Sequence, residues 1–321
     1  MSLNRRQLLR HAAALAAVAL YPARVNADPL AAPIIDTHQH LWDLDKYHLP
    51  WLDRARPLLK RNYSTADYLR AAAGLNVTQA MYMEVAVAAE QQAAEADEII
   101  ALCQNKSTPT VAAVIGGQPD TAGFREYITR YKANPFVKGV RSPFPNDGAT
   151  NAQFHASLKL LGELAMSYDL LLDSSMLPQA VQAVDACRET RFILDHCGNA
   201  STRFFAPASA ADENVQKRKR VWQDGIAALA DRKDVICKIS GVAESGSPED
   251  ATLENIAPIV NYCLDRFGPD RVIFASNWPV CLKAITFAKW VELAREITRD
   301  RGDAFQQKLF HDNARHFYHL P

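Results

Sequence analysis

The chain has 321 residues, of which 36 are basic and 36 acidic, so its net charge is zero with neutral histidine. A chain with balanced charge and no basic stripe is not typical of a nucleic-acid-binding protein. Hydrophobic residues make up 48% of the sequence, which is enough for a large packed interior in one domain or two.

The first 27 residues have the pattern of an export signal. Arg5 and Arg6 precede an alanine- and leucine-rich stretch, residues 12–21, and residues 25–27 end in the small side chains of a cleavage site. The apolar stretch is shorter than the roughly 20 residues that span a membrane, so no stable membrane anchor is expected. We predict a signal peptide over residues 1–27, of the twin-arginine type, and a bacterial protein that is periplasmic or secreted. An ordinary secretion signal is the alternative.

The six cysteines are widely spaced and contain no Cys-x-x-Cys pair. In a chain of this length they do not predict a disulfide framework, and most are expected to be small buried hydrophobic residues. Cys197 and Cys281 each follow a strand that carries candidate site residues, so a functional role remains open for these two.

Short apolar, β-branched runs alternate with helical segments from residue 28 to residue 321. We predict eight strands: Ile34–His38, Gln79–Val85, Thr110–Ile115, Val137–Arg141, Leu170–Ser174, Phe192–His196, Val235–Ile239 and Val272–Ser276. Eight strand–helix repeats predict an α/β protein with a single-domain (β/α)₈ barrel, known as a TIM barrel. A doubly wound sheet is the competitor, but no Gly-x-Gly-x-x-Gly turn follows any of these runs. Two long irregular segments, Tyr47–Arg61 and Gly198–Asn214, are expected to form lids over the pocket.

Catalytic side chains of such barrels lie at the carboxyl ends of the strands. Asp36, His38 and His40 alternate along the first strand and are therefore expected on one face. We expect these histidines to meet His196 from strand six, with the nearby aspartates orienting them. The predicted strand ends supply ten polar side chains in all: Asp36, His38, His40, Glu84, Arg141, Asp173, Asp195, His196, Lys238 and Asn277.

Five motifs and a closing segment together resemble the amidohydrolase superfamily. The branch is the amidohydrolase 2 type, which includes sugar-acid lactonases such as L-fuconolactonase and L-rhamnonolactonase, and 2-pyrone-4,6-dicarboxylate lactonase. The resemblance covers essentially the whole chain after residue 27. The matching segments are residues 36–42, 50–52, 195–198, 238–241 and 276–279, with the closing helix at 309–318.

The resemblance implies a hydrolase that opens a lactone by attack of water on a polarised carbonyl. One divalent ion, best zinc, would be bound by His38, His40, His196 and Glu84; in metal-free relatives the histidines polarise the carbonyl themselves. The substrate would be a small anionic or polyhydroxylated molecule, contacted by Arg141, Lys238, Trp51 and Trp278. The candidate catalytic residues are His196, Asn277, Glu84 and Asp173.

The main departure from the superfamily pattern lies at strand eight. Asn277 stands where an aspartate ordinarily takes the proton from the attacking water, and an amide cannot accept that proton at neutral pH. Three interpretations follow: a lactone hydrolase in which Glu84, Asp173, His196 or a metal hydroxide replaces the base, a metal-dependent decarboxylase, or a non-catalytic sugar-acid-binding barrel. Strand five offers only Asp173, which argues against a two-metal site. His155 is expected in a helix on the surface.

Overall fold

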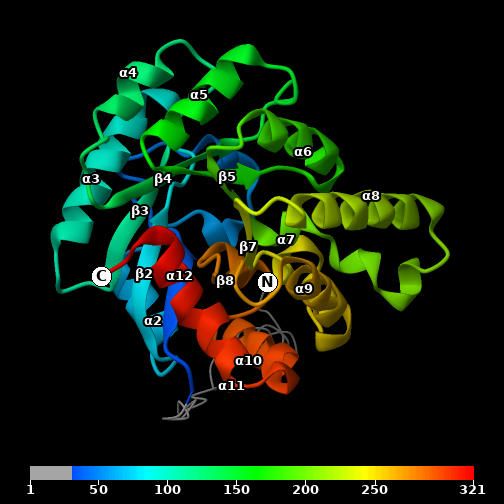
Figure 1. Ribbon diagram of the computed structural model, residues 1–321. Coiled ribbons are helices and arrows are strands. Elements are labelled where there is room, and N and C mark those ends of the chain that lie inside the picture. The colour runs from blue at the N-terminus through cyan, green and yellow to red at the C-terminus, as the bar shows by residue number, and fades with distance from the viewer. Residues whose placement is uncertain (1–30) are drawn as a thin grey trace, which may run out of the picture.

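The computed structural model describes residues 31–321, so the predicted signal peptide lies outside the described residues. Eight parallel strands follow one another in chain order around a barrel (Figure 1), which confirms the predicted TIM-barrel fold. The strands are β1 (Ile34–Gln39), β2 (Val77–Met83), β3 (Thr110–Gly116), β4 (Val137–Pro143), β5 (Ser167–Leu171), β6 (Arg191–Leu194), β7 (Val235–Ile239) and β8 (Val272–Phe274).

Helices surround the barrel and cover the outer faces of the strands (Figure 1). Within residues 31–321, no helix combines the length and the apolar character needed to cross a bilayer. The helices are α2 (Thr65–Ala72), α3 (Gln92–Gln104), α4 (Phe124–Thr129), α5 (Ala152–Glu163), α6 (Leu177–Ala186), α7 (His196–Asn199), α8 (Glu213–Ala230), α9 (Leu253–Phe267), α10 (Phe287–Thr298), α11 (Asp303–Gln307) and α12 (Asn313–Tyr318).

The barrel is sealed between β1 and β8 by a few specific contacts. Gln39 pairs with Trp278 in an isolated parallel bridge, and the Thr37 hydroxyl donates to the Phe274 carbonyl at 2.7 Å. Asp36 accepts two hydrogen bonds from Ser276, one from its backbone N–H at 2.8 Å and one from its hydroxyl at 2.6 Å. The buried carboxylate therefore joins the first strand to the residues just after the last one.

The expectation that Asp36 shares a face with His38 and His40 is wrong. The pairing of β1 with β2 is irregular between Asp36 and Gln39. Such a bulge breaks the alternation of side chains along a strand. Asp36 accepts a hydrogen bond from Tyr68 of α2 at 2.8 Å, while His38 lies against other histidines at the site. The two residues thus serve different sides of the sheet.

The predicted position of strand five is also wrong, by three residues. Ser167 pairs with Gly139 of β4, and β5 ends at Leu171. The apolar run that suggested a later strand continues into a turn, where Asp173 accepts a hydrogen bond from the Ser175 backbone at 2.9 Å. The buried carboxylate of this strand is therefore that of Asp169.

The interior of the barrel is filled below the site. Alternate strand residues such as Ile35, Met81 and Ile193 form an apolar cluster that also includes Tyr318 and Leu320 at the carboxyl end of the chain. The segment around α12 thus closes the end of the barrel where the strands begin. All six cysteines are free and buried, whereas the sequence predicted burial for most of them.

Candidate active site

The histidine pair of β1 forms the centre of the site. The Nε2 atoms of His38 and His40 lie 3.1 Å apart, and His40 Nδ1 lies 2.9 Å from the Met83 carbonyl. A carbonyl only accepts, so His40 carries its proton on Nδ1 and, when neutral, has a lone pair on Nε2. Burial lowers the pKa of both rings well below the ordinary histidine value. Both rings are therefore neutral.

Arg141 fixes the tautomer of the second ring. Its Nη1 atom lies 3.2 Å from His38 Nε2, and a guanidinium only donates. His38 therefore also has a lone pair on Nε2, and its protonated Nδ1 faces Asp195 Oδ1 at 3.6 Å. Two lone pairs thus point at one region from atoms that are 3.1 Å apart. Two nitrogens bound to one tetrahedral zinc ion at about 2.0–2.1 Å lie about 3.3 Å from each other, so the pair fits a bound cation.

His196 approaches this pair from the end of β6. Its ring centroid lies 4.5 Å from that of His38, and its Nδ1 lies 2.9 Å from the Ser240 hydroxyl oxygen. Burial lowers the pKa of His196 to about 4. The ligand atoms of His38, Asp195 and His196 lie within 4.8 Å of one another. These three residues with His40 form the donor group at the centre of the site.

Gly241 makes room for the His196 ring. The glycine has a φ of +69°, and a Cβ atom added to it would lie 2.3 Å from the Cβ of His196. Only a residue without a side chain accepts both the left-handed backbone and this close approach. The loop that follows β7 therefore packs directly on the histidine.

A buried ion cluster lies beside the donor group. Lys238 is fully buried and makes ion pairs with Asp169 and with Asp195 Oδ1, the latter at 3.2 Å. Burial by itself would raise the pKa of Asp195, but Lys238 and His38 hold that pKa well below its usual value. Both oxygens of Asp195 are buried and lack hydrogen-bond partners among the described residues. Lys238 thus neutralises aspartates and does not present its charge to a substrate.

Glu84 holds Arg141 in place. Glu84 Oε1 accepts from Arg141 Nε at 2.6 Å, and the Glu84 carbonyl accepts from Nη2 at 2.8 Å. The other carboxylate oxygen accepts from the Ala86 backbone at 2.6 Å. Because both oxygens are engaged, the structure does not bring Glu84 into the donor group as a metal ligand. It sets the direction of the guanidinium instead.

Three other predicted site residues lie apart from the donor group. Asp173 is exposed on the turn after β5, 3.8 Å from Arg218, so the structure does not place it as a base. Trp278 is buried and packs edge-on against Tyr63 and Tyr68, which leaves it no face for a substrate. Trp51 is half-buried in the first loop and donates from Nε1 to the Val85 carbonyl at 2.7 Å.

Asn277 contacts a carboxylate that the sequence analysis missed. Its Nδ2 atom donates to Glu244 Oε1 at 2.5 Å. Glu244 belongs to the short turn Ala243–Ser245, three residues after Gly241. The signal that could have found it is a lone acid just beyond the Lys-Ile-Ser-Gly motif of β7. Asn277, His40, Arg141 and His196 each keep 5 or 6% of their surface exposed, whereas His38 has none. These four residues form the rim that solvent can reach.

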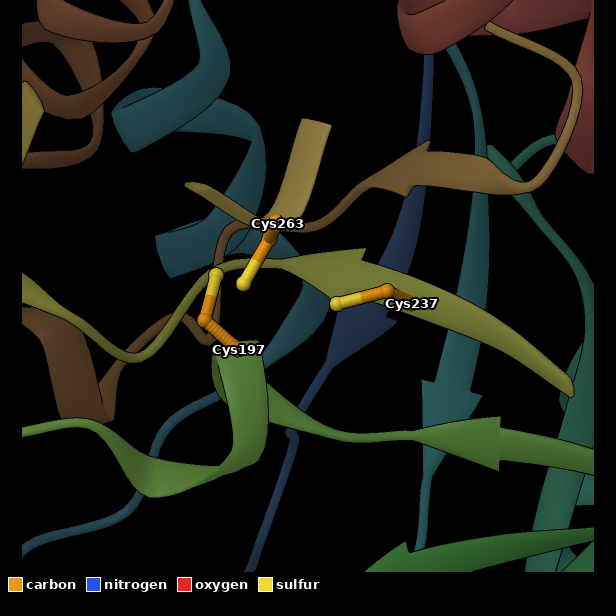
Figure 2. A group of neighbouring side chains, drawn as sticks. All are labelled: Cys197, Cys237 and Cys263. Carbon is orange, nitrogen blue, oxygen red and sulfur yellow. The ribbon is translucent and has the colours of Figure 1, made fainter. Parts of the chain in front are cut away.

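Three thiols lie behind His196. The sulfur atoms of Cys197, Cys237 and Cys263 lie within 4.8 Å of one another and face each other between β7 and α9 (Figure 2). Burial raises the pKa of the Cys237 and Cys263 thiols well above the ordinary value. Hydrogen bonds from these two thiols lower the pKa of the Cys197 thiol well below its ordinary value. The three fully buried sulfur atoms pack together and anchor the residue after His196. Cys281 is also buried, and its backbone N–H donates to the Asn277 carbonyl at 2.9 Å.

Comparisons with known proteins agree with this geometry. The family model described as Amidohydrolase matches residues 35–320. L-fucono-1,5-lactonase of Burkholderia multivorans is 27% identical over 299 residues, which cover 89% of this chain and 96% of the lactonase. A solved amidohydrolase structure from Burkholderia multivorans with bound HEPES has a TM-score of 0.78 and 23% identity, covering 90% of this chain and all of that one. A second structure from that organism, with bound zinc, has a TM-score of 0.76 and 23% identity with the same coverage.

Proposed function

The chain belongs to the amidohydrolase family, and on that premise we propose that it hydrolyses the ring ester of a sugar-acid lactone. The observation that carries the proposal is the convergence of His38 Nε2, His40 Nε2 and Arg141 Nη1 on a single region, where the arginine N–H donates to His38. A cation bound by these nitrogens, together with a fixed N–H donor beside it, would stabilise the negative charge that develops on a carbonyl oxygen as water attacks. The named lactonase relative supports a sugar lactone as the substrate class.

One divalent ion, best zinc, would be held by His38, His40, His196 and Asp195. The imidazole and carboxylate donors suit zinc, and the grouping of the His38, Asp195 and His196 ligand atoms within 4.8 Å of one another is the second observation that fits a cation here. Such an ion supplies Lewis-acid polarisation and lowers the pKa of bound water to about 7. In a metal-free reaction, Arg141 would be the cation nearest to His38.

The protein's own residues account for orientation and proton handling. Arg141 is held by two hydrogen bonds to Glu84, so its Nη1 is aimed before any substrate arrives. Such preorganised donors stabilise developing charge without a reorganisation cost. Burial lowers the pKa of His196 to about 4, so its ring is neutral at neutral pH and serves as an uncharged ligand rather than as a proton donor.

We propose that the first loop and the segment after β6 form the access side of the site. In this proposal the aromatic side chains of the first loop offer apolar surface, while Arg141, whose Nε and Nη2 are held by Glu84, offers its Nη1 group to an anionic or hydroxyl-bearing substrate. We propose a small anionic or polyhydroxylated substrate for this reason. Export of the protein is part of the same proposal, and fractionation of cells that express the full chain tests it.

The deciding experiment is a proton-release assay over a panel of sugar lactones. We expect the purified protein to open at least one of them, and His38→Asn to reduce the rate at least about 100-fold, as loss of a charge-stabilising group does. His155→Asn is the matched control, because His155 is half-buried in α5 and contacts the Gly148 carbonyl, away from the site. Metal analysis before and after chelation tests the ion. Release of carbon dioxide from aromatic acids without lactone turnover, or tight sugar-acid binding without either reaction, would replace this proposal with the decarboxylase or the binder.

A further inference from the structure

We infer that Glu244 is the catalytic base of the reaction, taking the proton from the attacking water in place of the strand-eight carboxylate that this chain lacks. The inference rests on the proposed lactone hydrolysis. It assigns Asn277 a separate task, which is to bind the base and orient the water.

The contact between the two side chains defines their roles. A carboxylate only accepts hydrogen bonds, so Asn277 must turn its NH₂ group toward Glu244. The amide oxygen of Asn277 then points away from Glu244 and remains an acceptor for a hydrogen of the water. The second oxygen of Glu244 is left to take the proton. The Asn277 amide thus orients the water and the Glu244 carboxylate takes its proton, two tasks that a single aspartate performs in the superfamily pattern.

The segment that leads to Glu244 begins beside His196. The backbone of Gly241 packs on the His196 ring, and Ser240 contacts its Nδ1 atom. Three residues later, the turn that carries Glu244 is fixed by Ser245, whose hydroxyl donates to the Val242 carbonyl at 2.7 Å and accepts from the Thr202 backbone at 3.1 Å. The carboxylate is therefore held by a short, hydrogen-bonded segment that starts at the site.

The surroundings of Glu244 favour a useful base. Burial raises the pKa of its carboxyl, while a hydrogen bond from its own backbone N–H, the Asn277 amide and the Lys283 ammonium act in the opposite direction. Lys283 also acts on the pKa of His196, so one cation faces both groups. The other titratable groups that face Glu244 are the thiols of Cys197 and Cys281. A carboxylate with a raised pKa accepts a proton from water more readily than an ordinary one.

The proposed step is balanced. The water oxygen forms a bond to the lactone carbonyl carbon while Glu244 takes one of its protons. The ring C–O bond then breaks, and the departing alkoxide takes the proton that Glu244 received from the water. Lactone and water become an open-chain hydroxy acid, and no oxidant or reductant is required.

The test is Glu244→Gln, measured on whichever lactone the wild-type protein opens. The amide retains an oxygen that accepts from Asn277, so folding is expected to be preserved. We expect kcat to fall about 10² to 10⁴-fold, KM to stay within about threefold, and the acidic limb of the pH profile to disappear. Glu244→Ala should regain activity with added formate, a carboxylate that fits the space. The control is Glu249→Gln, an exposed acid five residues further along, which should leave kcat unchanged.

The outcomes separate the two proposals. A wild-type protein that opens no lactone overturns the proposed function and the base assignment together. An active wild-type protein with an equally active Glu244→Gln variant overturns the assignment of Glu244 alone. A variant that loses activity but keeps the acidic limb, and whose alanine counterpart formate does not rescue, assigns Glu244 a positioning role and also overturns the inference.

Discussion

Replacing Lys238 by methionine tests whether this lysine is a buried counter-ion. The substitution keeps the length of the side chain and removes its positive charge. Asp169 and Asp195 are both fully buried, and the ammonium of Lys238 pairs with each of them. Without that ammonium, the two carboxylates would lose the positive charge that neutralises them. A lysine that bound substrate would give a different result, namely weaker binding with unchanged stability.

The expected loss of stability can be estimated from known buried ion pairs. Removing one partner of such a pair costs about 3–5 kcal/mol, because the remaining charge stays in a medium of low dielectric. In a domain of this size, each kcal/mol corresponds to about 2 °C in Tm, so we expect Tm to fall by about 6–10 °C. Adding Asp169→Asn to Lys238→Met removes one of the two stranded charges and should restore part of that loss.

Thermal and urea unfolding followed by circular dichroism measure this effect. Lys289→Met is the matched control, because Lys289 pairs with Glu292 on the surface of α10, where both side chains are about half-exposed. Exposed pairs contribute about 0–1 kcal/mol, so Tm should change by less than about 2 °C. If Lys238→Met leaves Tm unchanged and raises KM instead, the buried counter-ion interpretation is refuted and the lysine faces the substrate.

Three further predictions concern single side chains. Burial and the charge of Glu84 raise the pKa of Glu95 to about 7. Between about pH 4.5 and 7 the folded protein therefore keeps a proton on Glu95 that the unfolded chain has released. The free energy of unfolding falls as the pH rises through this window. Glu95→Gln should therefore raise the free energy of unfolding by up to about 3 kcal/mol at pH 8 and change it little at pH 4; equal effects at both values in urea titrations would contradict this. Gly241→Ala should displace the His196 side chain, because the added Cβ would lie 2.3 Å from the His196 Cβ and 2.4 Å from its ring atom Cγ. We expect kcat to fall by about 100-fold or more with the barrel intact by circular dichroism; unchanged turnover would show that the ring position is not critical. Asn277→Asp should fold normally, and the new aspartate would share a proton with Glu244. At a pH high enough to remove that proton, we expect lactone turnover to be kept or raised; a loss of about 100-fold at every pH would show that the amide itself is required.

The fold was predictable because eight buried strands produce a pattern that few other architectures share. Runs such as Val235–Ile239 are apolar on both faces, and their boundaries in the structure match the prediction. The histidines were predictable for a related reason. Charged or polar side chains at the ends of apolar strands are costly to bury without a function, and His38, His40 and His196 are such residues.

The details that were missed depend on contacts across the fold. Asp36 turns away from His38 because of a bulge against β2, which alternation along β1 does not reveal. The start of β5 is set by its register against β4, and the leucine run drew the prediction too far along the chain. Glu244 lies in a turn whose sequence has no periodicity, so only its contact with Asn277 identifies it.

The seal between β1 and β8 has a consequence for how the protein is made. Asp36 accepts two of its hydrogen bonds from Ser276, which lies 240 residues later in the sequence, while Tyr68 donates a third. A buried carboxylate that lacks part of its donors is unfavourable, so we expect the opening strand to reach its final position only after Ser276 has been synthesised. Nascent chains that stop short of that serine are therefore expected to remain open and to depend on chaperones, and the last strand to be synthesised completes the first.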